Sequence, residues 1–99
     1  MKFNEKILEE AHQHSFKNRE EIVKSELCGC FYCEVTFAPS EIEDWVDEGK
    51  NGIGQTALCP KCGIDSVAGS KSGFPVNEKV FLREMHKYWF DTIKPRQMR

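Results

Sequence analysis

Apolar residues recur at helical spacing in two stretches near the ends of the chain. In the first stretch, Asn4 stands where a helix cap would be, and the apolar positions are Phe3, Ile7, Leu8 and Ala11. In the second, the apolar positions are three or four residues apart and include Val80, Phe81, Met85, Tyr88 and Trp89. These two patterns predict helices over residues 4–15 and 77–91.

Two shorter segments carry capping signals. Asn18 is followed three residues later by Glu21, which predicts a helix from 18 to about 26. Ser40 is followed in the same way by Glu43, and Gly49 would end the helix. Residues 40–49 are therefore expected to form a third helix, with the apolar stripe Ile42, Trp45 and Val46.

The remaining segments are short and irregular. Residues 56–58 lead into CPKC as a short strand, and 64–75 read as a short strand followed by a Gly/Ser-rich loop. The prediction is a single α+β domain over residues 1–99, with about four helices and a few short strands. Its core would be of the zinc-knuckle type, resembling a zinc ribbon or a treble clef.

Two C-x₂-C pairs are the strongest chemical signal. Cys30 and Cys33 form one pair, Cys59 and Cys62 form the other, and 25 residues separate them. Each pair fits a tight turn that presents two thiolates on one side, and two such turns complete a tetrahedral S₄ shell for Zn²⁺. An iron–sulfur cluster is the alternative for four cysteines. A full Cys₄ shell leaves no position for water, so the metal is expected to be structural.

The two turns are not expected to be equivalent. Gly63 follows the second pair at a position that favours a positive φ, whereas Glu34 follows the first, so the first turn is expected to be less typical. Cys28 is the fifth cysteine and lies too close to Cys30 to replace a regular ligand. It is expected to be a buried thiol that supports the turn.

Composition and charge narrow the functional classes. The 99 residues carry a net charge of −2, with 12 acids and 5 bases in residues 1–49 and 4 acids and 9 bases in 50–99. This balance does not favour nucleic-acid binding, and the basic tail 87–99 is expected to be solvated. No stretch has the apolar character of a signal peptide or a membrane span, so a cytosolic location is expected.

A second candidate site consists of polar side chains outside the cysteine pairs. We expect a tentative ligand-binding group made of His12, His14, Arg19, Asp65 and Ser66. It would suit a small anionic ligand, such as a nucleotide, or a hydrolase that uses either histidine with Asp65. No motif assigns a catalytic residue, so a non-enzymatic binding or regulatory module with a protein partner is favoured. His86 is expected to be exposed, and Trp89-Phe90 is expected to pack in the core, with a homodimer interface as the alternative.

Several strings together resemble a family of short bacterial proteins described as cytoplasmic. They are AHQHS, CGCFYC, F-x-P-S-E-I, TALCPKCGIDSV and KYWF, and they extend from about residue 11 to residue 90. The resemblance implies a cytosolic bacterial or phage-borne protein with a zinc-binding core. It implies no activity.

Overall fold

The computed structural model describes residues 3–49 and 51–91. The helical segments are α1 (Glu5–His12), the 3₁₀ turn η1 (Gln13–Ser15), α2 (Arg19–Val23), the 3₁₀ turns η2 (Pro39–Glu41) and η3 (Ser70–Ser72), α3 (Lys79–His86) and the π-helical segment η4 (Lys87–Asp91). The strands are β1 (Cys28–Cys30), β2 (Thr36–Phe37), β3 (Trp45–Glu48), β4 (Gly54–Ala57) and β5 (Val67–Gly69). The predicted α+β class is confirmed. None of the described helices has the length and apolar character that crossing a membrane requires.

The central sheet consists of three short antiparallel strands in the order β2-β1-β5. β1 is the middle strand, and Cys30 lies opposite Val67 of β5. All three residues of β1 and of β5 are buried, because both faces of this sheet are covered. Gly29 allows that coverage: a Cβ at this position would lie 2.8 Å from the carbonyl oxygen of Val76.

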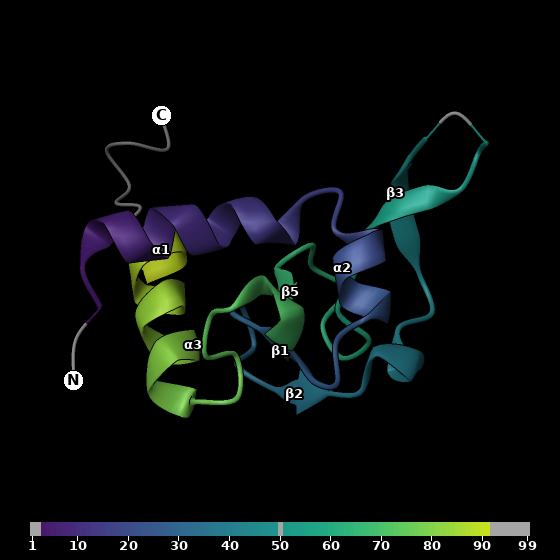
Figure 1. The fold of residues 1–99 in the computed structure, drawn as a ribbon. Helices are drawn as coiled ribbons and strands as arrows, with labels where there is room; N and C mark the ends of the chain where they lie inside the picture. Colours follow the sequence, from purple (N-terminus) through teal and green to yellow (C-terminus); the bar gives the residue numbers. More distant parts are fainter. Residues whose placement is uncertain (1–2, 50, 92–99) are drawn as a thin grey trace.

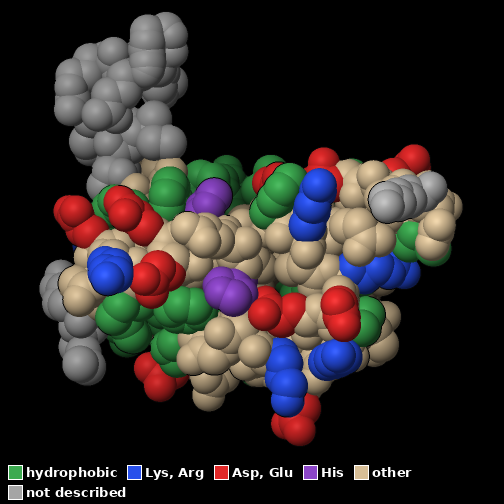
Figure 2. Space-filling view, turned by 45° about the horizontal axis from the view of Figure 1, so that its top comes forward, with side chains coloured by type: hydrophobic (Ala, Val, Ile, Leu, Met, Phe, Trp, Pro, Cys, Tyr) green, Lys and Arg blue, Asp and Glu red, His purple; other side chains and the backbone are tan. Residues whose placement is uncertain are grey.

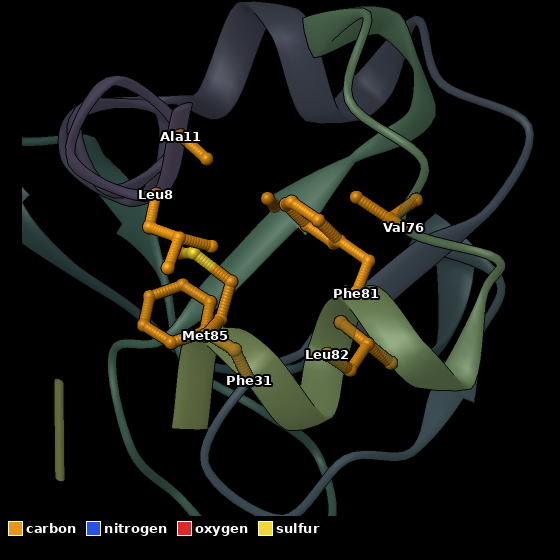
Figure 3. Close-up of a cluster of buried hydrophobic side chains, with 8 residues drawn as sticks. Leu8, Ala11, Phe31, Val76, Phe81, Leu82 and Met85 are labelled. Atoms are coloured by element: carbon orange, nitrogen blue, oxygen red, sulfur yellow. The ribbon is translucent and has the colours of Figure 1, made fainter. Parts of the chain in front are cut away.

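One face of the sheet packs against the two longer helices. α3 crosses beneath α1 at a steep angle (Figure 1). Side chains from both helices converge with Phe31 and Val76 between them (Figure 3). This helical core contains Leu8, Ala11, Phe31, Ala68, Val76, Phe81, Leu82 and Met85. Most of the apolar positions read from the sequence lie on the faces that α1 and α3 bury, but Val80 is 50% exposed. Both helix predictions hold to within two residues at their starts, whereas the α-helices end at His12 and His86 and continue as η1 and η4.

The other face of the sheet carries a second buried cluster that contains three cysteines. It is formed by Ile22, Cys28, Cys30, Phe37, Ile42, Ala57, Cys59 and Val67. Neighbouring residues of β5 point to different sides, with Val67 in this cluster and Ala68 in the helical core. β1 and β5 thus join a helical half of the molecule to a cysteine-rich half.

The helix predicted over residues 40–49 is wrong. The chain forms η2 and then β3, which pairs with β4 in a two-stranded hairpin that projects from the body (Figure 1). The capping contact lies two residues earlier than expected, since Glu41 accepts from the backbone N–H of Ala38 at 3.1 Å. Ile42 is already extended, at φ −74° and ψ 125°, and ends the turn. Trp45 and Val46 then take the strand conformation that aromatic and β-branched residues favour.

The base of the hairpin is attached to the start of α2 and to the residue that precedes it. The Arg19 guanidinium lies 4.4 Å from the centre of the Trp45 ring and donates to the carbonyl oxygen of Gly54 at 2.8 Å. Asn18 accepts from the backbone N–H of Ala57 at 3.2 Å. These contacts join residues far apart in the sequence, so tertiary packing overrides the local helix signal.

The other segments follow the prediction with smaller differences. The second helix is shorter than expected and ends at Val23 rather than near residue 26. The strand before CPKC begins at Gly54, and the strand after it is β5. On the face shown in Figure 2, acidic and basic side chains are intermixed rather than segregated. Residues 92–99 of the basic tail lie outside the described residues.

Candidate metal centre

The two C-x₂-C pairs form turns with the same backbone hydrogen bonds. Each position of the first turn has a counterpart 29 residues later. In the first, the N–H of Glu34 donates to the Cys30 carbonyl at 2.8 Å, and the N–H of Tyr32 points to the Cys30 sulfur at 3.3 Å. In the second, Gly63 donates to the Cys59 carbonyl at 2.9 Å, and Lys61 points to the Cys59 sulfur at 3.3 Å. Both turns are therefore zinc-knuckle-like.

The expectation that the first turn would be less typical is wrong. Glu34 takes φ +65°, close to the φ +79° of Gly63, so both turns close through a left-handed residue. A non-glycine residue in this conformation costs about 1–2 kcal/mol because its Cβ crowds the backbone. Glu34 keeps this conformation because only the left-handed backbone lets its N–H donate to the carbonyl oxygen of Cys30.

The two turns face each other and bring four sulfur atoms together. Cys30 lies 3.7 Å from Cys62, and Cys33 lies 3.7 Å from Cys59, measured between their Sγ atoms. All four Sγ atoms lie within 4.8 Å of one another and could hold one metal ion. Cys30 and Cys59 are buried, whereas Cys33 and Cys62 are half-buried and form the outer side of the cluster.

Burial and mutual proximity set the protonation of the thiols. Burial raises the pKa of Cys33, and the nearby Cys30 raises it further. Burial likewise raises the pKa of Cys62, to about 11. Burial also acts to raise the pKa of Cys59, but hydrogen bonds from the N–H groups of Cys62 and Lys61 and from the Cys33 and Cys62 side chains together outweigh it, so this pKa is lowered. A bound cation would replace the remaining protons, so metal uptake releases protons and acid opposes it.

The fifth cysteine lies apart from this cluster. Cys28 is fully buried in β1, opposite Phe37 of β2. Burial raises its pKa to about 12. It is therefore a protonated thiol in the cysteine-rich half of the core, with little of the thiolate character that reactivity needs.

The polar residues predicted to form a ligand site are only partly brought together. Asp65 is exposed and near enough to His12 to oppose the effect of burial, which lowers the pKa of His12. His14 instead lies 2.9 Å from the Glu21 carboxylate, and Arg19 lies against the hairpin. Ser66 lies at the cysteine cluster. Of the five residues predicted to bind an anionic ligand, only His12 and Asp65 are brought near each other. The ligand site stays a prediction.

The end of α3 and the segment η4 pack near the first cysteine turn and α1, and the sequence did not indicate these contacts. His86 is half-buried rather than exposed: its Nδ1 lies 2.7 Å from the carbonyl oxygen of Tyr32. The Trp89 ring lies against the His12 ring at a tilt of 32°, with ring centres 4.0 Å apart, and its indole N–H donates to the carbonyl oxygen of Leu8 at 3.2 Å. Trp89 therefore contributes to packing within the chain. No spacing rule could have paired His86 with Tyr32, because 54 positions separate them.

Comparison of the chain with protein-family models, with curated proteins and with solved structures found no match. The resemblance to short bacterial proteins is supported only for its metal-binding core, by the four-cysteine cluster. Fold and site together define an α+β chain with a possible structural Cys₄ metal centre.

Proposed function

We propose that this protein is a non-enzymatic binding module whose fold is stabilised by one structural Zn²⁺ ion at Cys30, Cys33, Cys59 and Cys62. The observation that carries the proposal is the spacing of the sulfur atoms. A tetrahedral ion with Zn–S bonds of about 2.3 Å places its ligands about 3.8 Å apart. Two of the sulfur pairs are separated by 3.7 Å.

The same spacing distinguishes a single ion from a cluster. An iron–sulfur cluster places several iron atoms and bridging sulfides between its cysteines, which would hold the four thiolates further apart than one ion does. The backbone N–H groups aimed at Cys30 and Cys59 stabilise negative charge on the two buried sulfurs, as a tetrathiolate site requires. Because neighbouring free thiols this close would oxidise readily, the proposal includes a reducing compartment.

The ligand set also argues against catalysis at the metal. Catalytic zinc sites use three protein ligands and keep a fourth position for water or substrate, whereas four thiolates fill the shell. His12 and Asp65 are the pair of polar residues that comes nearest to a catalytic arrangement, but the His12 ring is engaged in tilted contacts with the Trp89 and Phe31 rings. We therefore propose that the ion contributes only to the stability of the fold.

Metal analysis of the purified protein tests the proposal. We expect one zinc per chain by elemental analysis and native mass spectrometry, and one Co²⁺ per chain after exchange, with the absorption of a tetrahedral tetrathiolate site. A Cys33→Ser variant should lose this stoichiometry, while Cys28→Ala should keep it, because Cys28 lies outside the cluster. Iron with acid-labile sulfide, or no metal in freshly purified protein, would contradict the assignment.

We further propose that the β3–β4 hairpin is the surface through which the module contacts a basic protein segment. Among the described residues, β3 pairs with β4 alone, whereas β4 is also bonded to Asn18 and Arg19. Val46 and Ile53 are 39% and 46% exposed, a large fraction for apolar side chains. The acids on and before β3 are all exposed: Glu43, Asp44, Asp47 and Glu48. A cationic, extended chain would complement both the charge and the free strand edge.

An oligolysine peptide serves as a probe of this surface. Titration followed by NMR is expected to shift the amide resonances of residues 43–48 and 53, with binding that weakens as salt is added. The double variant E43K/E48K should abolish these shifts, and it leaves the left-handed Asp47 (φ +59°) unchanged. The control E10K/E26K makes the same charge change at exposed acids elsewhere and should preserve them. Equal loss in both variants would mean that only net charge matters and would refute the hairpin as the contact.

A further inference from the structure

One contact at the cysteine cluster breaks the equivalence of the two turns. The Ser66 hydroxyl oxygen lies 3.0 Å from the Cys30 sulfur, and both side chains are buried, with 2% and 0% of their surfaces exposed. The position that corresponds to Ser66 in the first half is Phe37, 29 residues earlier, which is apolar and buried. Cys59 therefore receives no hydroxyl from the corresponding position.

The backbone of Ser66 also contacts the first turn. Its carbonyl oxygen accepts from the N–H of Phe31 at 2.9 Å. The corresponding residue in the second turn is Pro60, which has no N–H to donate. The segment that leaves the second turn is thus attached to the first turn at two points, one on the backbone next to Cys30 and one on its sulfur.

The direction of the hydroxyl contact follows from the charge on the sulfur. A thiol can donate or accept, but a metal-bound thiolate has no proton, so the Ser66 hydroxyl must donate. The Cys30 sulfur then accepts from three groups: the N–H of Tyr32 at 3.3 Å, the N–H of Cys33 at 3.4 Å and the hydroxyl of Ser66. In a buried site these donors replace the water that would otherwise solvate the negative sulfur.

We propose that Ser66 is the positioning residue of the metal centre: it donates to the Cys30 thiolate, orients it and strengthens retention of the ion. This inference rests on the proposed zinc site and adds to it a residue that is not a ligand. Hydrogen-bond partners of metal ligands orient them and typically contribute about 10- to 100-fold in metal affinity. Ser66 makes Cys30 the most firmly held ligand, while Cys33 and Cys62 on the half-buried side are the ones that an incoming chelator reaches first.

The Ser66→Ala variant tests this role in the cobalt-loaded and zinc-loaded protein. Competition with a chromophoric chelator should show metal affinity about 10- to 100-fold weaker than in the wild type. The thiolate-to-cobalt charge-transfer band should also move, because one sulfur loses a donor. The control Ser15→Ala removes a buried hydroxyl that donates to the His12 carbonyl at 2.6 Å. It should lower stability without moving the band.

A pair of variants with equal side-chain shape separates the hydroxyl from packing. Ser66→Thr retains the donor and Ser66→Val replaces it with a methyl group, so Thr should restore the wild-type band and Val should not. The inference is overturned if Ser66→Ala keeps wild-type affinity and band position, or if the Thr and Val variants behave alike. Wild-type protein that binds neither metal would instead overturn the proposed function, so the two failures are distinguishable.

Discussion

The Cys59→Ser variant is expected to lose the folded state under conditions in which the wild type is fully folded. Cys59 is a buried member of the cysteine cluster, and its backbone N–H donates to the Ile64 carbonyl at 2.9 Å within the second turn. Structural zinc contributes apparent free energies on the order of 10 kcal/mol in small domains. A whole domain is commonly stable by only about 5–15 kcal/mol, so loss of the ion removes most of that margin.

Far-UV circular dichroism and the dispersion of amide resonances measure this loss. Excess chelator added to the wild type should reproduce the effect, and added Zn²⁺ should reverse it. Cys28→Ala provides the control, since it removes a fully buried sulfur from the same half of the core without touching the cluster. It should lower the melting temperature but leave one zinc per chain. A Cys59→Ser protein with wild-type melting behaviour would show that the cluster does not stabilise the fold.

The Phe81→Ala variant is expected to cost about 3–5 kcal/mol of unfolding free energy. The Phe81 side chain is fully buried in the helical core. It meets the Phe3 ring edge-on at 5.2 Å and stacks on the Phe74 ring at 6.1 Å, so truncation removes two aromatic contacts and leaves a cavity. Figure 3 shows its ring directed into the space between α1, α3 and Val76.

Urea denaturation at saturating Zn²⁺ measures this effect separately from metal occupancy. The neighbouring Val80 is 50% exposed on the same helix, so Val80→Ala should change the unfolding free energy by less than about 0.5 kcal/mol. A loss below about 1 kcal/mol for Phe81→Ala would mean that the helices do not share the core described above.

These two variants act on opposite faces of one small sheet. Cys59 belongs to the cysteine-rich half and Phe81 to the helical half, and the residues of β1 and β5 contribute to both. A chain of about 100 residues has little core to spare, so neither half is expected to stay folded when the other is lost. Unfolding should therefore be a single transition in zinc-loaded protein.

Local patterns predicted the elements that local physics determines. The C-x₂-C spacing specifies a turn closed by hydrogen bonds within five residues, so all four clustered cysteines could be named in advance. α1 and α3 could also be predicted, because a 3.6-residue apolar period requires one buried face whatever the partner is. The left-handed Glu34 was missed because the turn imposes its conformation against the preference of the residue.

The rest depended on residues that meet only in the folded chain. Residues 40–49 carry both helix and strand signals, and pairing with β4 together with the Arg19–Trp45 contact selects the strand. His86 contacts Tyr32, and His14 contacts Glu21 rather than His12 or Asp65. Ser66 could be named as a polar residue after the second pair, but its partner Cys30 lies 36 positions away. Sequence spacing determines which side chains a turn places on one side. The residue that each of these side chains contacts across the sheet depends on tertiary packing, which no local pattern encodes.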